Sequence, residues 1–240
     1  MSWIQDAGHG GIDPGAVANG NIEKIYTLEA ALYVNKRLNE HGITSVCSRT
    51  EDVTLEENQR VNLVKNYKKA ISHHFNAGGG SGAECIVSQY ANKTLANLII
   101  DKFKENKFPV RPNAVFTRKL PNGQDYYYMH RRTGNCDVTI VEYDFVDGPQ
   151  SDKIKDKAYR EKMYEAVVEA MCISEGIKYQ SLVNKPVEVV TKQDENEPSS
   201  WAKTEWNKAV TKGIFDGTNP RNAFTREQAA IVLDRLGLLD

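Results

Sequence analysis

The sequence has few cysteines, no long apolar run and no excess of charge, and each shortage excludes a class of protein. Its four cysteines lie far apart without a CxxC pair, which argues against a cysteine zinc site and a dense disulfide scaffold. No apolar stretch approaches the roughly 20 residues that a membrane-spanning helix needs. The 31 Lys and Arg residues balance 32 Asp and Glu residues, so the basic excess typical of nucleic-acid binding is missing. We therefore expect neither a nucleic-acid nor a membrane partner.

The first six residues lack the basic and apolar segments of a secretory signal peptide. On this reading, we expect the protein to be synthesised in the cytoplasm and to stay there unless another factor releases it.

Residues 1–180 alternate helix-like and strand-like stretches. This alternation predicts an α/β domain with a mostly parallel, twisted sheet flanked by helices. The predicted helices cover residues 24–40, 55–67, 95–104 and 152–175. A first strand runs into His9, and further strands are predicted at residues 43–47, 70–75, 84–89, 114–117, 126–130 and 138–143. The glycine-rich residues 78–82 predict a mobile loop.

The composition and periodicity of the sequence change after residue 180. Residues 181–199 are polar, contain two prolines and show no period, which indicates a linker. Residues 200–240 form a small helical module, with amphipathic helices at 201–212 and 225–236, the second opened by a Thr225–Gln228 capping box. Because about forty residues make a marginal core, we expect this module to need a surface or a second copy.

Three histidines stand at the ends of predicted strands. His9 lies between glycines at a strand end, where open α/β sheets bind ligands, although a structural histidine in a glycine-rich turn explains it equally well. His73 and His74 end another strand. Because side chains alternate along a strand, only one of these two can share a site with His9.

Two carboxylates complete the candidate site. Glu23 precedes a predicted helix, where a carboxylate commonly interacts with the helix dipole, but two imidazoles in need of a third ligand favour a metal role. Two His and one carboxylate leave a fourth position for water, the pattern of catalytic zinc. Glu142 ends a hydrophobic strand, either as an ordinary strand-terminal residue or as a general base for a metal-bound water.

Four separated motifs resemble, in order, those of the zinc-dependent N-acetylmuramoyl-L-alanine amidases of the type 3 class. They are residues 6–16 (DAGHGGIDPGA), Glu23, residues 72–77 (SHHFNA) and residues 141–145 (VEYDF). This family contains peptidoglycan hydrolases of bacterial autolysins and phage endolysins, and the resemblance covers roughly residues 1–178. It implies that His9, Glu23 and His74 bind Zn²⁺ and that Glu142 is catalytic.

The sequence departs from the family pattern at two places. A histidine, His73, stands where the family usually has a small apolar residue, so the choice of His74 as ligand depends on its spacing from Asn76. The last motif often reads Glu-x-Gly-Phe, whereas Asp144 stands here in place of the glycine. Both departures lie beside the implied catalytic residues without removing one.

The resemblance implies hydrolysis of the amide between the muramic lactyl group and L-alanine by zinc-activated water. Glu142 would take the water proton and deliver it to the leaving amine. We expect Asp6 and Asn76 to hold the ligand imidazoles in one tautomer. For His130, beside three tyrosines, a substrate contact is the less favoured reading and a strand cap the more favoured one.

Residues 201–229 resemble a single S-layer homology motif, a kind of module that anchors proteins to secondary cell-wall polymers. The resemblance gives Arg226 an anion-binding role and lets Trp201 or Trp206 stack on sugar rings. The alternative is that the tryptophans and Phe215 form the small core. Because the family typically uses three copies, assembly of several chains through this module is left open.

Together these expectations describe a bacteriophage endolysin that reaches the cell wall after release from the cytoplasm, cuts peptidoglycan and causes lysis. The alternatives are a zinc peptidase acting within the stem peptide, a host autolysin or spore-lytic amidase, and a wall-binding protein whose catalytic domain is inactive.

Overall fold

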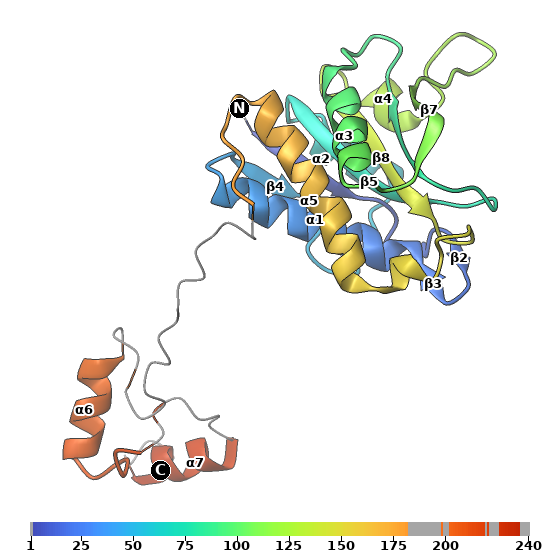
Figure 1. Cartoon of the computed structure of the whole chain (residues 1–240). Coiled ribbons are helices and arrows are strands. Elements are labelled where there is room, and N and C mark those ends of the chain that lie inside the picture. The colour runs from blue at the N-terminus through green and yellow to red at the C-terminus, as the bar shows by residue number, and fades with distance from the viewer. Residues whose placement is uncertain (1, 182–197, 199–201, 219, 221–225, 236–240) are drawn as a thin grey trace. The chain divides into compact units, whose positions relative to one another are not determined.

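The computed structural model describes residues 2–181, 198, 202–218, 220 and 226–235 (Figure 1). The chain divides into two compact units, Met1–Tyr179 and Gln180–Asp240. Apart from residues 181 and 198, the predicted linker lies outside the described residues. None of the helices in the described parts of the chain is both long and apolar enough to cross a membrane.

A six-stranded sheet in the order β4-β1-β5-β8-β6-β7 forms the centre of the first unit. Its strands are β1 (Trp3–Ala7), β4 (Ser45–Cys47), β5 (Lys69–Asn76), β6 (Ala83–Val87), β7 (Val110–Phe116) and β8 (Asp137–Phe145). All neighbours pair in parallel except β6 and β8, which are antiparallel. A short hairpin of β2 (Val17–Ala18) and β3 (Asn21–Ile22) stands apart. The mostly parallel α/β sheet that the alternation predicted is confirmed.

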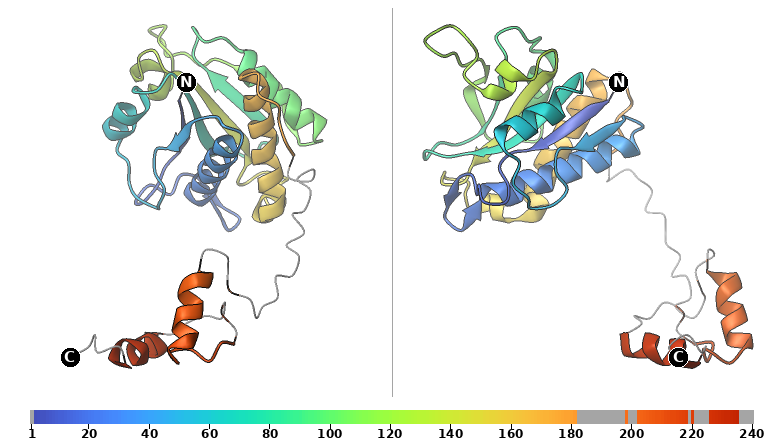
Figure 2. Two further views of the ribbon diagram at one scale, coloured as in Figure 1. Left: turned by 90° about the vertical axis from the view of Figure 1, so that its left-hand side faces the viewer. Right: turned by 180° about the vertical axis from the view of Figure 1, so that it is seen from behind.

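Helices cover both faces of the sheet (Figure 2). The longer ones, α1 (Glu23–Glu40), α3 (Thr94–Glu105) and α5 (Lys157–Ser174), share the larger apolar core with one face. The short helices α2 (Glu57–Val64) and α4 (Tyr128–Arg132) contribute Val64 and Met129 to a smaller core on the other face. The predicted helix 152–175 is in fact a 3₁₀ turn, Lys153–Lys155, followed by α5, because the Asp156 side chain caps the Ala158 N–H and starts the helix there.

The predicted strand at residues 126–130 is wrong, because this segment turns into α4. Its run of tyrosines has high strand propensity, but burial of Met129 against the sheet decides the conformation. The Arg131 side chain also donates hydrogen bonds to the carbonyls of Asp125 and Tyr126, which would otherwise need N–H donors from a neighbouring strand.

Two aspartates, one near the end of β8 and one just after it, hold the glycine-rich loop between β5 and β6. Asp147 accepts the N–H groups of Gly78 and Gly79, at 2.8 and 3.0 Å, and Asp144 accepts that of Gly82 at 2.9 Å. A Cβ on Gly80 would lie 2.5 Å from the Phe145 ring, so only glycine fits there. The loop predicted to be mobile is therefore tied to the end of β8.

A chain of buried, hydrogen-bonded polar side chains crosses four adjacent strands of the sheet, β8, β5, β1 and β4. The Tyr143 hydroxyl lies 2.8 Å from His73 Nδ1, His73 Nε2 lies 3.1 Å from Gln5 Oε1, and Gln5 Nε2 donates to Ser45 Oγ. Because the Gln5 oxygen only accepts, His73 Nε2 carries the proton and Nδ1 accepts from Tyr143. Burial lowers the pKa of His73 to about 3, which keeps the ring neutral. His73 is thus a structural residue, on the face opposite to His74.

The second unit contains α6 (Lys203–Thr211) and α7 (Arg226–Arg235). Trp206 stacks on Phe215, with ring centroids 5.1 Å apart and planes at 15°. This contact supports the alternative that Trp206 packs with Phe215 in the small core of the module. Trp201 and the Thr225 end of the predicted capping box lie outside the described residues, and α7 begins at Arg226.

We expect Tyr143→Phe to destabilise the first unit by about 1–3 kcal/mol, because it leaves the buried His73 Nδ1 without a donor. Urea denaturation followed by circular dichroism measures this change. Tyr126→Phe is the control, since that ring is half exposed. An unchanged unfolding midpoint for Tyr143→Phe would contradict the hydrogen-bond assignment.

Candidate metal centre and active site

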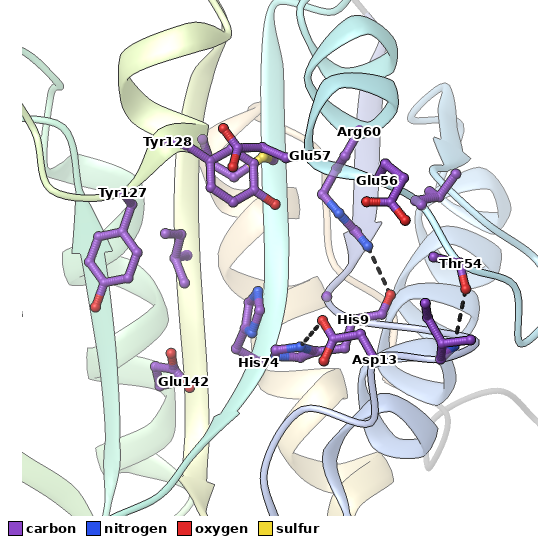
Figure 3. Close-up of a pocket in the computed structure, with 15 residues that line it drawn as sticks. His9, Asp13, Thr54, Glu56, Glu57, Arg60, His74, Tyr127, Tyr128 and Glu142 are labelled. Carbon is purple, nitrogen blue, oxygen red and sulfur yellow. Dashed lines mark hydrogen bonds and ion pairs between the residues drawn. The ribbon is translucent and has the colours of Figure 1, made fainter.

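A cavity of about 390 Å³ opens where β1, β5 and β8 end (Figure 3). Parallel strands bring their carboxyl ends to one edge, so residues distant in the sequence meet there. The loop after β1 contributes His9, β5 contributes His74 and β8 contributes Glu142. The first turn of α2 and the start of α4 supply much of the remaining wall. The cavity places the predicted ligand histidines and the predicted catalytic carboxylate on one surface.

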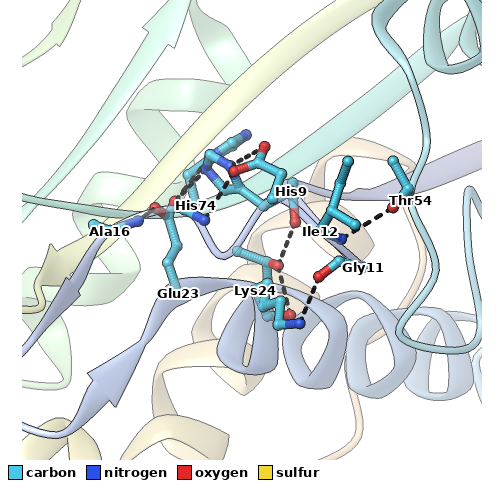
Figure 4. Close-up of polar contacts among 12 residues, drawn as sticks. His9, Gly11, Ile12, Ala16, Glu23, Lys24, Thr54 and His74 are labelled. Carbon is cyan, nitrogen blue, oxygen red and sulfur yellow. Dashed lines mark hydrogen bonds and ion pairs between the residues drawn. The ribbon is translucent and has the colours of Figure 1, made fainter.

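His9, Glu23 and His74 converge on a single point (Figure 4). One carboxylate oxygen, Glu23 Oε1, lies 3.1 Å from His9 Nε2 and 2.9 Å from His74 Nδ1. One potential ligand atom from each residue lies within 4.8 Å of the others. Two imidazole nitrogens and a carboxylate oxygen form a donor set that suits Zn²⁺ and leaves room for water or substrate. The residues therefore fit the metal that the sequence predicted, while their assignment as ligands stays a prediction.

The backbone aims the Glu23 carboxylate at the two imidazoles. Its Oε2 accepts the Ala16 N–H at 2.8 Å and its Oε1 accepts the Phe75 N–H at 3.0 Å. Although Glu23 is the first residue of α1, these amides belong to other segments, so more than a helix-dipole contact determines its place. Burial opposes ionisation, but hydrogen bonds from both histidines hold the pKa of Glu23 well below its usual range.

The protonation of His9 links metal binding to pH. Burial lowers the pKa of this ring, but the hydrogen bonds to Glu23 and Asp13 outweigh burial and raise it to about 9. A metal ion needs the free nitrogen lone pair, so an ion bound by His9 near neutral pH would have to displace a proton.

Two buried arginines hold the loop that carries His9. The backbone of His9 has φ 59°, a left-handed conformation that non-glycine residues rarely adopt. Arg60 donates to the carbonyls of Ala7 and His9 at 2.6 and 2.8 Å, and Arg49 donates to that of Gly8 at 3.0 Å. The surrounding structure thus maintains a strained backbone at His9.

The residues expected to orient the imidazoles bind elsewhere, and this part of the prediction is wrong. Asp6 pairs with Arg60 at 2.5 Å and accepts from Ser72 at 2.7 Å. Asn76 donates to Glu84 at 2.8 Å. Among the described contacts, neither side chain hydrogen-bonds to His9 or His74.

Asp13 performs the orienting task instead. Its Oδ2 lies 2.8 Å from His9 Nδ1, the ring nitrogen that faces away from Glu23, and its Oδ1 accepts the Gly15 N–H. A carboxylate on the outer nitrogen fixes the tautomer and raises the basicity of a ligand histidine. The signal was present in the sequence as an acid four residues after His9 in the same glycine-rich segment.

Glu142 faces the cavity that His9 and His74 also line (Figure 3). In the sheet it stands in register with His74 on one side and Glu84 on the other. Its Oε2 is buried without a hydrogen-bond partner among the described residues. Burial raises the pKa of Glu142 to about 7, despite the opposing effect of His74. A carboxyl group that titrates near neutral pH can both accept and donate a proton.

Glu84 is a residue of this site region that sequence reasoning missed. Its carboxylate is bound by Arg111 at 2.7 Å and by Asn76, so Glu142 remains the carboxylate with a free oxygen. His130, in contrast, does not line the cavity, whereas its neighbours Tyr127 and Tyr128 do.

The family model for N-acetylmuramoyl-L-alanine amidase (Amidase_3) matches residues 4–172 of this chain. The chain belongs to this family. The match spans every residue of the cavity and of the metal cluster described above.

Curated relatives and solved structures agree with this amidase assignment. The chain is 43% identical over 86 residues to the sporulation-specific N-acetylmuramoyl-L-alanine amidase of Bacillus subtilis, a match that covers 34% of each protein. It is 30% identical over 171 residues to LytC of the same organism, covering 68% of this chain and 33% of LytC. The chain thus spans about a third of the length of these curated relatives.

Among solved structures, Cwp6 from Clostridium difficile superposes with a TM-score of 0.67 at 30% identity, over 74% of this chain and 29% of that one. The catalytic domain of CwlV from Bacillus (Paenibacillus) polymyxa gives 0.65 at 22% identity, over 74% of this chain and 99% of that domain. The second likeness shows the shared fold.

We expect Asp13→Asn to weaken Zn²⁺ binding by about 10- to 100-fold, because the amide removes the negative charge beside His9 Nδ1 while keeping the shape. Competition with a chromophoric chelator measures the affinity of the metal-free protein. Asp152→Asn is the matched control, since that aspartate is exposed and pairs only with Lys155 in the described contacts. Equal affinities for both variants would contradict the orienting role.

Proposed function

We propose that this protein is a zinc-dependent peptidoglycan hydrolase that cleaves the amide bond between N-acetylmuramic acid and L-alanine. The observation that carries the proposal is the meeting of His9, Glu23 and His74 with the partnerless carboxylate of Glu142 in one cavity. Membership of the amidase family supports the choice of this bond.

Each residue of the site has a distinct task in this reaction. His9, Glu23 and His74 would hold a zinc ion, which when bound would supply Lewis acidity for the scissile carbonyl and the attacking water. Glu142 takes the proton of that water and then donates it to the departing α-amine of alanine. Asp13 keeps His9 in one tautomer throughout. Burial of Glu142 next to the cluster keeps its pKa close to the value that this double task needs.

Purified sacculi distinguish this reaction from its alternatives. We expect the protein to release new amino termini of alanine, and an added chelator to abolish the release. New termini of other residues would instead indicate a peptidase of the stem peptide. Absence of any release would indicate a wall-binding protein with an inactive catalytic domain.

We further propose a phage endolysin as the biological role, with synthesis in the cytoplasm and action on the wall after release. The relatives of this chain include the sporulation-specific and germination-specific amidases of Bacillus subtilis, which support a host spore-lytic enzyme as the second candidate. Expression inside host cells, with and without a protein that permeabilises the membrane, tests the first role. Lysis only after permeabilisation is the expected result.

The second unit is proposed to bind a secondary cell-wall polymer, as its resemblance to an S-layer homology motif implies. Co-sedimentation of the full chain with walls before and after removal of that polymer tests this attachment. Light scattering of the same sample determines whether several chains assemble.

We expect Glu142→Gln to abolish hydrolysis while the protein keeps its metal. In the metal-free protein this variant should be more stable than the wild type well above pH 7, by about 3 kcal/mol. The folded-state pKa of Glu142 is raised from 4.5 to about 7, so ionisation opposes folding across that window. The two proteins should be equally stable at pH 4. Denaturant titrations at both pH values measure the difference.

The same pKa predicts the acid side of the pH profile. Because Glu142 must be ionised to accept a proton, kcat/KM should rise with pH and level off above the pKa of Glu142, which is about 7 without metal and which a bound Zn²⁺ would lower. Well below that pKa, kcat/KM should fall about tenfold per pH unit. A profile that stays flat down to the lowest pH at which measured zinc occupancy is constant would contradict Glu142 as the base.

A further inference from the structure

A second hollow lies next to the candidate active site, with α4 bordering both. Two cavities of about 380 and 300 Å³ share Tyr90, His130 and Gly134 in their walls, and we call them together the α4 hollow. The helix contributes Met129 to the active-site cavity and the next two residues, His130 and Arg131, to the α4 hollow. A ligand that extends across α4 can therefore touch both places.

The walls of the α4 hollow have the chemistry of a carbohydrate site. Tyr90 is 86% exposed, the highest value among the large apolar side chains of the described residues. Around it stand planar amides, namely Gln89, Asn92, Gln124 and Asn135. An exposed ring offers an apolar face with a polar tip, and amides offer both donors and acceptors. A sugar ring combines apolar faces with hydroxyl and acetamido groups, so these side chains complement it.

His130 supplies an unused acceptor at the wall of this hollow. A hydrogen bond to the Val138 backbone engages the ring, whereas its Nε2 is buried without a partner among the described residues. Burial lowers the pKa of His130, so the ring is neutral and Nε2 can accept. A buried acceptor without a donor is unfavourable, and a ligand hydroxyl that meets Nε2 after a small rotation of the ring would relieve it.

We propose that the α4 hollow is a remote subsite for the glycan strand, binding N-acetylhexosamine units next to the one whose amide bond is cut. This inference rests on the proposed function, because a polymeric substrate is what makes a second subsite useful. It assigns Tyr90 and His130 to glycan contact and leaves them outside the catalytic steps.

Two substrates of different length test the subsite in the full-length, zinc-loaded protein. Tyr90→Ala should lower the initial rate on limiting sacculi by about fivefold, the factor expected for loss of one ring contact. The rate on a soluble muramoyl-peptide, which is too short to reach the α4 hollow, should be unchanged. Ile25→Ala is the control, because that apolar side chain is 51% exposed on α1 and lines neither hollow.

The outcomes separate this inference from the proposed function. If the wild type cuts both substrates and Tyr90→Ala matches it on both, the subsite is wrong. An equal loss on both substrates also overturns it, since the residue would then act on the active site. If the wild type cuts neither substrate, the proposed function fails.

A binding measurement tests the subsite without catalysis. Chitotetraose, an N-acetylglucosamine oligomer without peptide, is titrated into the full-length Glu142→Gln protein. We expect the ring NMR signals of His130 and Tyr90 to shift together. In the double variant with Tyr90→Ala, the His130 shift should be lost at the same ligand concentration. A His130 signal that stays in place in the Glu142→Gln protein overturns the proposal.

Discussion

The arrangement of the site depends on the contacts that the Glu23 carboxylate makes. This carboxylate joins the loop after β1, the hairpin region and β5, by accepting backbone amides from Ala16 and Phe75 and facing both imidazoles. Because Glu23 opens α1, the packing of that helix on the sheet determines where the carboxylate lies. Buried ion pairs between α1 and α5, such as Arg37 with Glu165, keep the helix in place.

The site is held in an arrangement that would be unfavourable alone. His9 has a left-handed backbone, and Glu142 is a buried carboxylate beside Glu23 and Glu84. Other contacts of the fold stabilise this arrangement. Arg60 and Arg49 donate hydrogen bonds to the carbonyls of His9 and Gly8. Buried hydrogen bonds that join Tyr143, His73 and Gln5 link the strands of the sheet. Strain of this kind commonly collects where function requires a fixed geometry. The side chains of the candidate site are therefore held in a fixed geometry.

Strand-end positions made much of the site predictable. His9, His74 and Glu142 each stand near the carboxyl end of a predicted strand, and parallel strands bring such ends together. Alternation likewise predicted that His73 and His74 face opposite sides. The prediction failed where tertiary contacts override local preference. The tyrosines before Met129 favour a strand, yet burial of that methionine makes α4.

The sequence by itself determined the α/β class, the alternation of elements and the residues able to bind a metal, because these depend on periodicity and on the chemistry of single side chains. Only the tertiary structure decided which acid orients His9 and which acids are engaged elsewhere. Asp6 and Asn76 were the expected partners, but Arg60, from a distant segment, engages Asp6, and Glu84 engages Asn76. Asp13 lies only four residues after His9, yet the fold of the loop is what brings its carboxylate to His9 Nδ1. The pKa of Glu142 near 7 was decided in the same way, since burial is a property of the packed chain.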